Sequence, residues 1–430
     1  MISDINPVDG MVSPSEIDRS GLVPQQFRMH NGQNVFFFPD MHTELVRLDF
    51  VFNAGTSLQD KPYQSAAAIR LLTEGTSRHS ALQIAEFFDF RGIIVERGND
   101  TVTATLTVYS LTRHLEALMP LLREILTEAT YPQQEFDLYI AYRRQNLLAD
   151  LQKTSVVARR HFNQLLFGDS HPQGRFGQCE DFDRLTVEDV RTFSRRHIRL
   201  SEARIVASGR VTPQVLDMID STLAVSPYVE PASVLVPQPT GFATGLRTFE
   251  VPNAVQNTLR VGRLLPFRWD DRDYARFMVL STVLGGYFGS RLMSNLREDK
   301  GFTYGINALT QLCRGSIVFY IVTDVAADKA EPAMREIMHE IERLRVEPVS
   351  DEELRLVRSS MLGDFMRSID GIFERAERFC QMVSPGIDER FTDNFMSALE
   401  EDAVTPADLQ QLASRILDPA SLLQVSAGKI

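Results

Sequence analysis

The chain has 430 residues, of which 43% are hydrophobic and 24% are charged, as is usual for a globular protein with enough length for two cores. Its formal net charge is -12 and it has no run of Lys and Arg, which argues against nucleic acid or an anionic membrane surface as a partner. No apolar stretch approaches the length needed to span a bilayer.

The cysteines and the start of the chain bear on the compartment. Cys179, Cys313 and Cys380 are widely spaced and odd in number, so they support neither a disulfide framework nor a thiolate zinc site. The first twenty residues lack the basic start and the apolar stretch of a signal peptide. We therefore expect a reduced, cytoplasmic protein.

The first part of the chain reads as strands followed by helices. Residues 1–26 are polar and rich in Pro and Ser, which predicts an arm lying over the surface. A first domain is expected over 27–224, opening with a β-hairpin around Asn31-Gly32. Further strands are expected over 45–55, 93–110 (a strand pair) and 203–212. Helices are expected over 62–77, 79–92, 110–129, 133–152, 154–167, 186–196 and 213–224.

The second part repeats this order. Residues 225–246 hold four prolines and two glycines without a period, which is typical of a linker. A second domain is expected over 247–430. It shows two strands, a helix, a strand hairpin through Gly315, further helices and a final strand. We predict an α+β fold of two homologous halves, each with a mainly antiparallel sheet covered by helices.

The stretch 284–304, LGGYFGSRLMSNLREDKGFTY, is the most informative part of the sequence. Ser290 can cap a helix that ends near Arg297, and Gly301 can stop it. Tyr304 then lies at the start of the next strand. A guanidinium fork and a phenol are donors suited to a carbonyl oxygen or an oxyanion. On chemistry alone, a solvated arginine and a half-buried tyrosine are the favoured interpretation, because isolated pairs of this kind are common.

This stretch resembles the signature of the C-terminal half of the pitrilysin/insulinase family of zinc peptidases, the inverzincins. The family pattern G-G-x-x-x-S-R-L-x-x-x-L-R-E-x-x-G-x-x-Y is matched at Gly285, Gly286, Ser290, Arg291, Leu292, Leu296, Arg297, Glu298, Gly301 and Tyr304. The resemblance implies that Arg297 and Tyr304 hold the substrate carbonyl, and that Gly285, Gly286 and Ser290 help to bind the substrate. It also implies one bowl of a clamshell, which agrees with the repeated order of elements.

The zinc motif of that family does not occur in this chain. Inverzincins bind zinc through H-x-x-E-H on a helix that leads into a Gly-Thr pair. Counting back from Gly75-Thr76, the three functional places of the motif are occupied by Ala66, Ile69 and Arg70. No two of the eight histidines are closer than ten residues, so no helix can present a His pair one turn apart. Helix 133–152 also lacks a glutamate late in its length.

Other arrangements of catalytic residues have little support. A zinc site built from distant residues would have to use groups such as His161 and His171, and the latter lies in a segment typical of a turn. His339 begins HEIER, but Arg343 takes the second ligand place, so a solvated helix face is expected. Neither a G-x-S-x-G motif nor a base adjacent to Cys179 is present. We therefore expect no metal and no other cofactor in this chain.

The resemblance implies a zinc-less subunit of a pitrilysin-type peptidase, inactive alone. Such a subunit pairs with a zinc-bearing homologous chain, or with a second copy of itself, and holds a peptide as an added strand on a sheet edge. The alternative is a non-catalytic peptide-binding or scaffold protein with the same fold, which the core subunits of respiratory complexes resemble.

Overall fold

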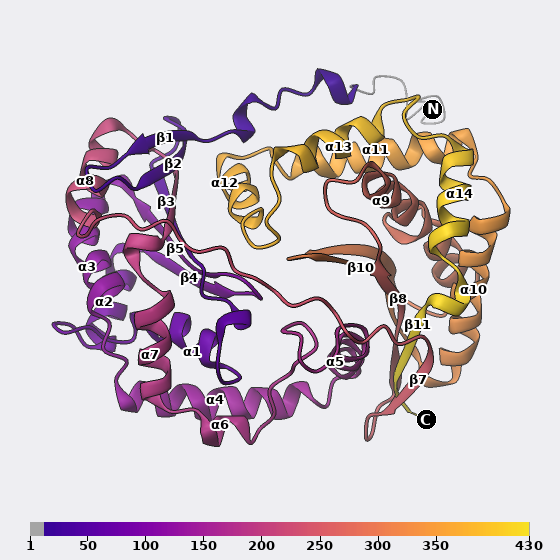
Figure 1. Ribbon diagram of the computed structural model, residues 1–430, viewed down its shortest axis with the longest axis horizontal. Coiled ribbons are helices and arrows are strands. Elements are labelled where there is room, and N and C mark those ends of the chain that lie inside the picture. Colours follow the sequence, from indigo (N-terminus) through magenta and orange to yellow (C-terminus); the bar gives the residue numbers. More distant parts are fainter. Residues whose placement is uncertain (1–12, 430) are drawn as a thin grey trace.

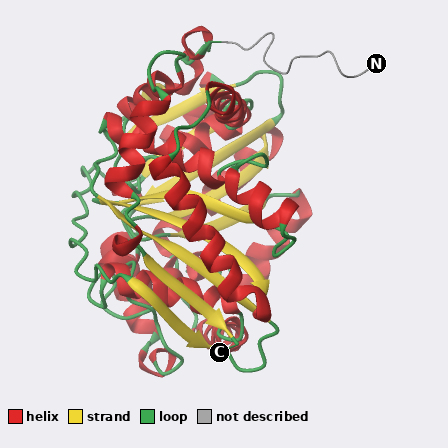
Figure 2. Ribbon diagram, turned by 90° about the vertical axis from the view of Figure 1, so that its right-hand side faces the viewer, coloured by secondary structure: helices red, strands yellow, loops and turns green. Residues whose placement is uncertain are grey.

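The computed structural model describes residues 13–429, so residues 1–12 of the predicted arm lie outside the described residues. The chain forms two halves, each built from one sheet and the helices around it (Figure 1). Seen from the side of the second half, helices lie over the strands (Figure 2). The α+β fold class is confirmed.

The first sheet has six strands in the order β1-β2-β6-β3-β5-β4. Strands β2 and β6 are parallel, and every other neighbouring pair is antiparallel. The strands are β1 (Gln25–Arg28), β2 (Asn34–Pro39), β3 (Leu45–Phe52), β4 (Ile94–Asn99), β5 (Ala104–Leu111) and β6 (Arg204–Gly209).

The second sheet has five strands in the order β7-β11-β8-β10-β9. Strands β7 and β11 are parallel and the others pair antiparallel. This order matches β2-β6-β3-β5-β4 of the first sheet, so the predicted duplication is confirmed at the level of topology. The strands are β7 (Gly245–Glu250), β8 (Gln256–Leu265), β9 (Ile306–Cys313), β10 (Ser316–Ala326) and β11 (Leu423–Gly428).

The helices occupy similar places in both halves, except that α8 follows β6 in the first half and no described helix follows β11 in the second. In the first half they are α1 (Gln64–Arg70), α2 (Ala81–Arg91), α3 (Leu115–Glu128), α4 (Gln133–Asp150), α5 (Thr154–Phe167), α6 (Asp181–Arg184), α7 (Val187–His197) and α8 (Pro213–Leu223). In the second half they are α9 (Arg272–Gly285), α10 (Ala330–Val346), α11 (Asp351–Arg367), α12 (Ile372–Gln381), α13 (Glu389–Leu399) and α14 (Pro406–Ile416). The sequence analysis missed α6 and α13.

Helices α5 and α12 are exchanged between the halves. Helix α5 precedes the linker but packs on β8 and β11 of the second sheet, where Phe162 and Leu166 are buried against Leu423 and Val425. Helix α12 belongs to the second half but packs on β2, β3 and β6, with Ala376 fully buried. A boundary drawn at residues 225–246 therefore separates the two sheets but cuts each of these helices off from the sheet it covers.

Two extended segments also cross between the halves. Two backbone N–H groups of the linker donate hydrogen bonds to other parts of the chain. The N–H of Tyr228 donates to the carbonyl of Asn31 in the first half (3.1 Å), and the N–H of Thr240 donates to the carbonyl of Phe167 at the end of α5 (2.9 Å). The arm before β1 pairs Arg19 with Asp393 of α13 at 2.6 Å. Within the described range, none of the helices combines the length and the apolar character needed to cross a membrane.

The exchange of helices predicts a large effect of a core substitution in α5. Phe162→Ala removes a fully buried ring that joins α5 to the second sheet. It should lower the free energy of unfolding by about 3–5 kcal/mol in chemical denaturation, because a buried phenylalanine leaves a cavity. Phe90→Ala, at a side chain that is 87% exposed, is the matched control and should change it by less than about 0.5 kcal/mol. Equal effects of the two substitutions would contradict the exchange.

Candidate functional site

The predicted motif lies in the turn between α9 and β9. A Cβ added to Gly285 would lie 2.8 Å from Cβ of Ala308, so the absence of a side chain lets α9 end close against β9. Gly301 has φ +62°, a conformation that glycine adopts without strain. The N–H of Phe302 donates to the carbonyl of Leu296 at 2.8 Å, which closes the helical turn behind Gly301. Gly301 thus ends the helix as predicted.

The segment before Gly301 is a π-helix, η7 (Met293–Asp299), where the sequence pattern predicted an ordinary α-helix. The N–H of Lys300 donates to the carbonyl of Asn295, five residues earlier, at 3.0 Å. Leu292 and Leu296 are buried as the helical pattern required. Because each π turn holds one more residue than an α turn, the side chain of Arg297 points in a different direction from the one an α-helix would give. Such turns are rare and are frequent at functional sites.

Ion pairs and hydrogen bonds anchor this π-helix to the helices beneath it. Arg291 forms a two-pronged pair with Glu353 of α11, with both N–O distances at 2.9 Å. Asn295 donates to Glu336 (3.1 Å) and to Glu340 (2.6 Å) of α10. The backbone that carries Arg297 is therefore fixed from two sides.

Arg297 and Tyr304 themselves are free in the described part of the chain. The side chain of Tyr304 is 99% exposed, which is unusual for a large aromatic residue. The guanidinium of Arg297 lies 4.7 Å from the ring centre of Phe288, which is itself 61% exposed. Neither side chain hydrogen-bonds or forms an ion pair with any residue between 13 and 429, nor do the two bond to each other. The predicted pair is thus presented to solvent from one anchored segment.

The three residues predicted to help bind the substrate differ in exposure. Gly285 and Ser290 are buried, and only Gly286 is exposed. The first two shape the packing of the turn, and the hydroxyl of Ser290 has no hydrogen-bond partner within the described residues. Direct contact of these residues with a substrate stays a prediction.

Helix α1 carries the three places of the absent zinc motif. Ala66 is partly buried, Ile69 is buried and Arg70 is exposed. Arg97 of β4 lies near this helix end: burial lowers the pKa of Arg97, and the charge of Arg70 contributes to the same direction. Two guanidinium groups near this place oppose binding of a divalent cation. In residues 13–429, no three His, Cys, Asp or Glu side chains are grouped so as to hold a metal ion.

The remaining histidines have structural surroundings. His161 stacks on Phe249 with ring centres 3.7 Å apart. His171 is buried, and its Nδ1 accepts a hydrogen bond from the N–H of Gln173 at 3.0 Å, as expected for a residue that closes a turn. His339 is exposed on α10, in agreement with the expected solvated face.

A buried ion pair within β3, which also contacts α12 of the second half, was not predicted from the sequence. Arg47 and Asp49 face the same side of β3, with an N–O distance of 2.9 Å, and Thr107 donates to Asp49 at 2.7 Å. Arg47 also lies 3.5 Å from Glu377 of α12. Burial opposes the charge of Arg47, but the carboxylate of Asp49 outweighs it and raises the pKa of Arg47. The sequence does indicate this ion pair, because two charged residues lie on one face of an otherwise apolar strand.

The geometry at α1 predicts the metal content of the isolated protein. Purified alone, the chain should carry no stoichiometric zinc by elemental analysis, because Ala66 and Arg70 occupy the places of the two ligands. The double substitution Ala66→His and Arg70→His puts two imidazoles one turn apart and should bind zinc more tightly than the unchanged chain. One tightly held zinc in the unchanged chain, with no gain in the double variant, would contradict this prediction.

Comparison with known proteins places these features in a family. Residues 184–361 match the family model described as the peptidase M16 inactive domain. The "non-peptidase homolog YmxG" of Helicobacter pylori is 25% identical over 275 residues, which cover 60% of each chain. An "uncharacterized zinc protease" of Rickettsia felis is 20% identical over 359 residues, covering 81% of this chain and 85% of that one. This chain thus spans less than two thirds of the first relative's length.

Solved structures with the same fold cover nearly the whole chain. A peptidase M16 inactive domain from Pseudomonas fluorescens has a TM-score of 0.81 at 20% identity, covering 95% of this chain and 98% of that one. A protease from H. pylori has a TM-score of 0.82 at 15% identity, covering 94% and 100%.

A longer structure shows the same fold as part of a larger chain. The periplasmic protease PqqL from Escherichia coli has a TM-score of 0.72 at 12% identity, with 98% of this chain but only 48% of that one covered. The fold, the motif of residues 285–304 and these matches make the chain similar to the pitrilysin-type (M16) family, with residues 184–361 resembling its inactive domain.

Proposed function

We propose that this chain is the zinc-less subunit of a two-chain peptidase. In the proposed complex, a homologous partner supplies the zinc ion through an intact H-x-x-E-H motif. Arg297 and Tyr304 of this chain then donate hydrogen bonds to the scissile carbonyl of a peptide held between the two bowls. Alone, the chain is inactive.

The exposure of Tyr304 carries this proposal. A phenol that is 99% exposed contributes nothing to its own fold, yet the backbone on either side of it is tightly held. Arg297 likewise forms no hydrogen bond or ion pair within residues 13–429, and its guanidinium lies 4.7 Å from the ring centre of Phe288. Donors held in advance at the position where charge develops are the usual means of stabilising an oxyanion.

The sheet edge next to the pair suits an extended peptide. Strand β9 is the last strand of the second sheet and begins two residues after Tyr304. An edge strand offers unpaired backbone groups to an added strand. A peptide on this edge would pass the pair at the end of the strand.

The length of one structural neighbour supports pairing. This chain matches 48% of the PqqL chain, so that protein has room for a second unit of similar size. Two separate chains would provide the same arrangement by association. A second copy of this chain in place of a zinc-bearing partner would give a homodimer without a metal.

A non-catalytic function is the second candidate. It is favoured by the description of the H. pylori relative as a non-peptidase homolog. In that case the fold would bind peptides or serve as a scaffold, and Arg297 and Tyr304 would be dispensable for catalysis. An adjacent reading frame that encodes a similar chain with H-x-x-E-H would favour the peptidase subunit over the scaffold.

Conservative substitutions test the role of the pair in the complex with a zinc-bearing partner. Tyr304→Phe removes one hydroxyl, and Arg297→Lys keeps the charge but loses the fork. Each should lower kcat for peptide cleavage by roughly one to three powers of ten, as is typical when an oxyanion donor is removed. kcat/KM should fall at least as much as kcat. Zinc content and assembly should be unchanged.

Matched controls come from exposed residues on other helices. Tyr142→Phe on α4 and Arg335→Lys on α10 change exposed side chains outside residues 285–304, and should leave the rate unchanged. If Tyr304→Phe and Arg297→Lys cleave as fast as these controls, the pair is not catalytic and the scaffold function is favoured.

A further inference from the structure

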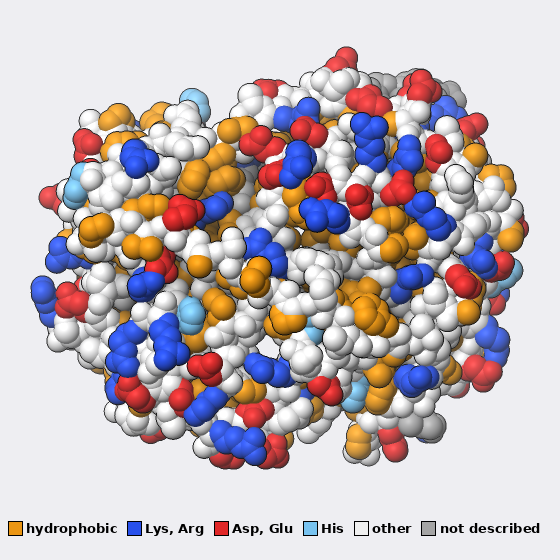
Figure 3. Space-filling view, viewed as in Figure 1, with side chains coloured by type: hydrophobic (Ala, Val, Ile, Leu, Met, Phe, Trp, Pro, Cys, Tyr) orange, Lys and Arg blue, Asp and Glu red, His pale blue; other side chains and the backbone are white. Residues whose placement is uncertain are grey.

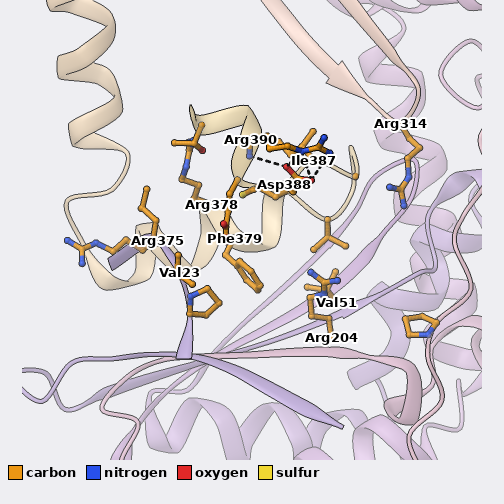
Figure 4. Close-up of a pocket in the computed structure, with 18 of the residues that line it drawn as sticks. Val23, Val51, Arg204, Arg314, Arg375, Arg378, Phe379, Ile387, Asp388 and Arg390 are labelled. Carbon is orange, nitrogen blue, oxygen red and sulfur yellow. Dashed lines mark hydrogen bonds and ion pairs between the residues drawn. The ribbon is translucent and has the colours of Figure 1, made fainter. Parts of the chain in front are cut away.

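A cavity of about 860 Å³ lies between the two halves, away from the Arg297 and Tyr304 segment. Figure 4 shows its walls: Arg378 and Phe379 come from α12, Val51 and Arg204 from the first sheet, and Arg314 from the turn between β9 and β10. The arm before β1 and the linker complete the wall with Val23 and Pro231. This volume is within the range of small-molecule and short-peptide sites.

Four guanidinium groups in this wall form no ion pair among residues 13–429. They belong to Arg204 of β6, Arg314 of the β9–β10 turn, and Arg375 and Arg378 of α12. Other surface charges are distributed differently: on the face seen in Figure 3, acidic and basic side chains are interspersed. The cavity thus brings together unpaired positive charges from three distant parts of a chain whose net charge is -12.

Three of the five acidic side chains in the same wall are already paired. Asp388 binds Arg390 at 2.9 Å, and Asp393 binds Arg19 at 2.6 Å. Glu202 pairs with Arg199 next to β6. The other two are Glu230, which accepts a hydrogen bond from the hydroxyl of Tyr228, and Glu389, which forms no ion pair among residues 13–429. The four guanidinium groups without an ion pair therefore outnumber the carboxylates without one.

Three of these arginines, Arg204, Arg314 and Arg378, are held in place by contacts other than ion pairs, although the charge of Asp100 acts on Arg314 from a greater distance. Arg378 donates to the hydroxyl of Thr392 at 3.0 Å and lies 4.9 Å from the ring centre of Phe365. Arg204 lies 5.8 Å from the ring centre of Phe379. The Nε of Arg314 is buried without a hydrogen-bond partner in the described residues.

Burial has an energetic cost for two of these groups. It lowers the pKa of both Arg314 and Arg378. A buried cation that lacks a carboxylate is costly, and a bound anion would offset that cost.

Apolar side chains line the rest of the cavity. Phe379, Met382 and Val383 come from α12 and its end, Val51 from β3, and Ile387 from the loop before α13. A ligand that fits both surfaces carries an anionic group next to an apolar one. A free phosphate ion has the anionic group but no apolar group.

We propose that this cavity binds the C-terminal end of a peptide. The terminal carboxylate lies among Arg204, Arg314 and Arg378, and an apolar last side chain contacts Phe379 and Met382. Arginine forks match the planar geometry of a carboxylate. This site is a second peptide contact of the chain, separate from Arg297 and Tyr304, and it needs neither zinc nor a partner.

The test uses the complete chain and a defined probe in isothermal titration calorimetry. The probe is N-acetyl-Ala-Ala-Phe with a free carboxylate, compared with the same peptide as a C-terminal amide. The free acid should bind at one site per chain, and the amide at least about tenfold more weakly. Arg314→Gln and Arg378→Gln should each weaken binding of the acid by about 10- to 100-fold, which is typical of a lost charge-assisted hydrogen bond.

Controls separate the site from general effects of charge and folding. Arg335→Gln removes an exposed charge on α10 and should leave binding unchanged. Arg204→Gln changes an exposed side chain, so it keeps the test valid if the two more buried substitutions prevent folding.

Two results would overturn the proposal. One is equal affinity for the acid and the amide, or no saturable binding of either. The other is binding of inorganic phosphate that the arginine substitutions weaken, without binding of the peptide. Because the titration needs no partner, either result would leave the kinetic test of Arg297 and Tyr304 unaffected.

Discussion

The exchange of α5 and α12 is the constraint on which the rest of the structure depends. Each half has a large core of its own, and each exchanged helix buries its apolar face on the sheet of the opposite half in a smaller cluster. The two sheets are thereby fixed relative to each other, and the pair Arg47–Asp49 adds a charged contact that reaches α12. This rigid arrangement positions the segment of Arg297 and Tyr304 and encloses the cavity between the halves.

In the proposed complex, this chain holds the peptide and the partner cleaves it. The first half keeps the helix of the family's zinc motif but carries Ala66, Ile69 and Arg70 on it. The second half keeps the turn of Gly285 and Gly301, and its anchored π-helix presents Arg297 without a partner. A chain with free donors but without an assembled metal site would complete its chemistry only with a second subunit.

Much of the fold could be predicted from the sequence because its signals are local. Ser80 with Gln83 and Thr405 with Asp408 have the sequence spacing of a capping box, and both capping boxes are formed in the structure. Other features have no local signal. An apolar helix face does not tell which sheet it covers, so the exchange of α5 was not predicted. The π-helix keeps the spacing of Leu292 and Leu296, and Arg204, Arg314 and Arg378 are too far apart in sequence to form a motif.

The central claim is that this chain works with a zinc-bearing partner. Its most direct test is affinity purification of the tagged chain from its native cells, followed by identification of bound proteins and zinc analysis. The account predicts one homologous chain with an H-x-x-E-H motif, about one zinc per pair, and peptide cleavage by the pair but not by either chain alone. Recovery of the chain by itself, or with a partner that carries no zinc, would contradict it.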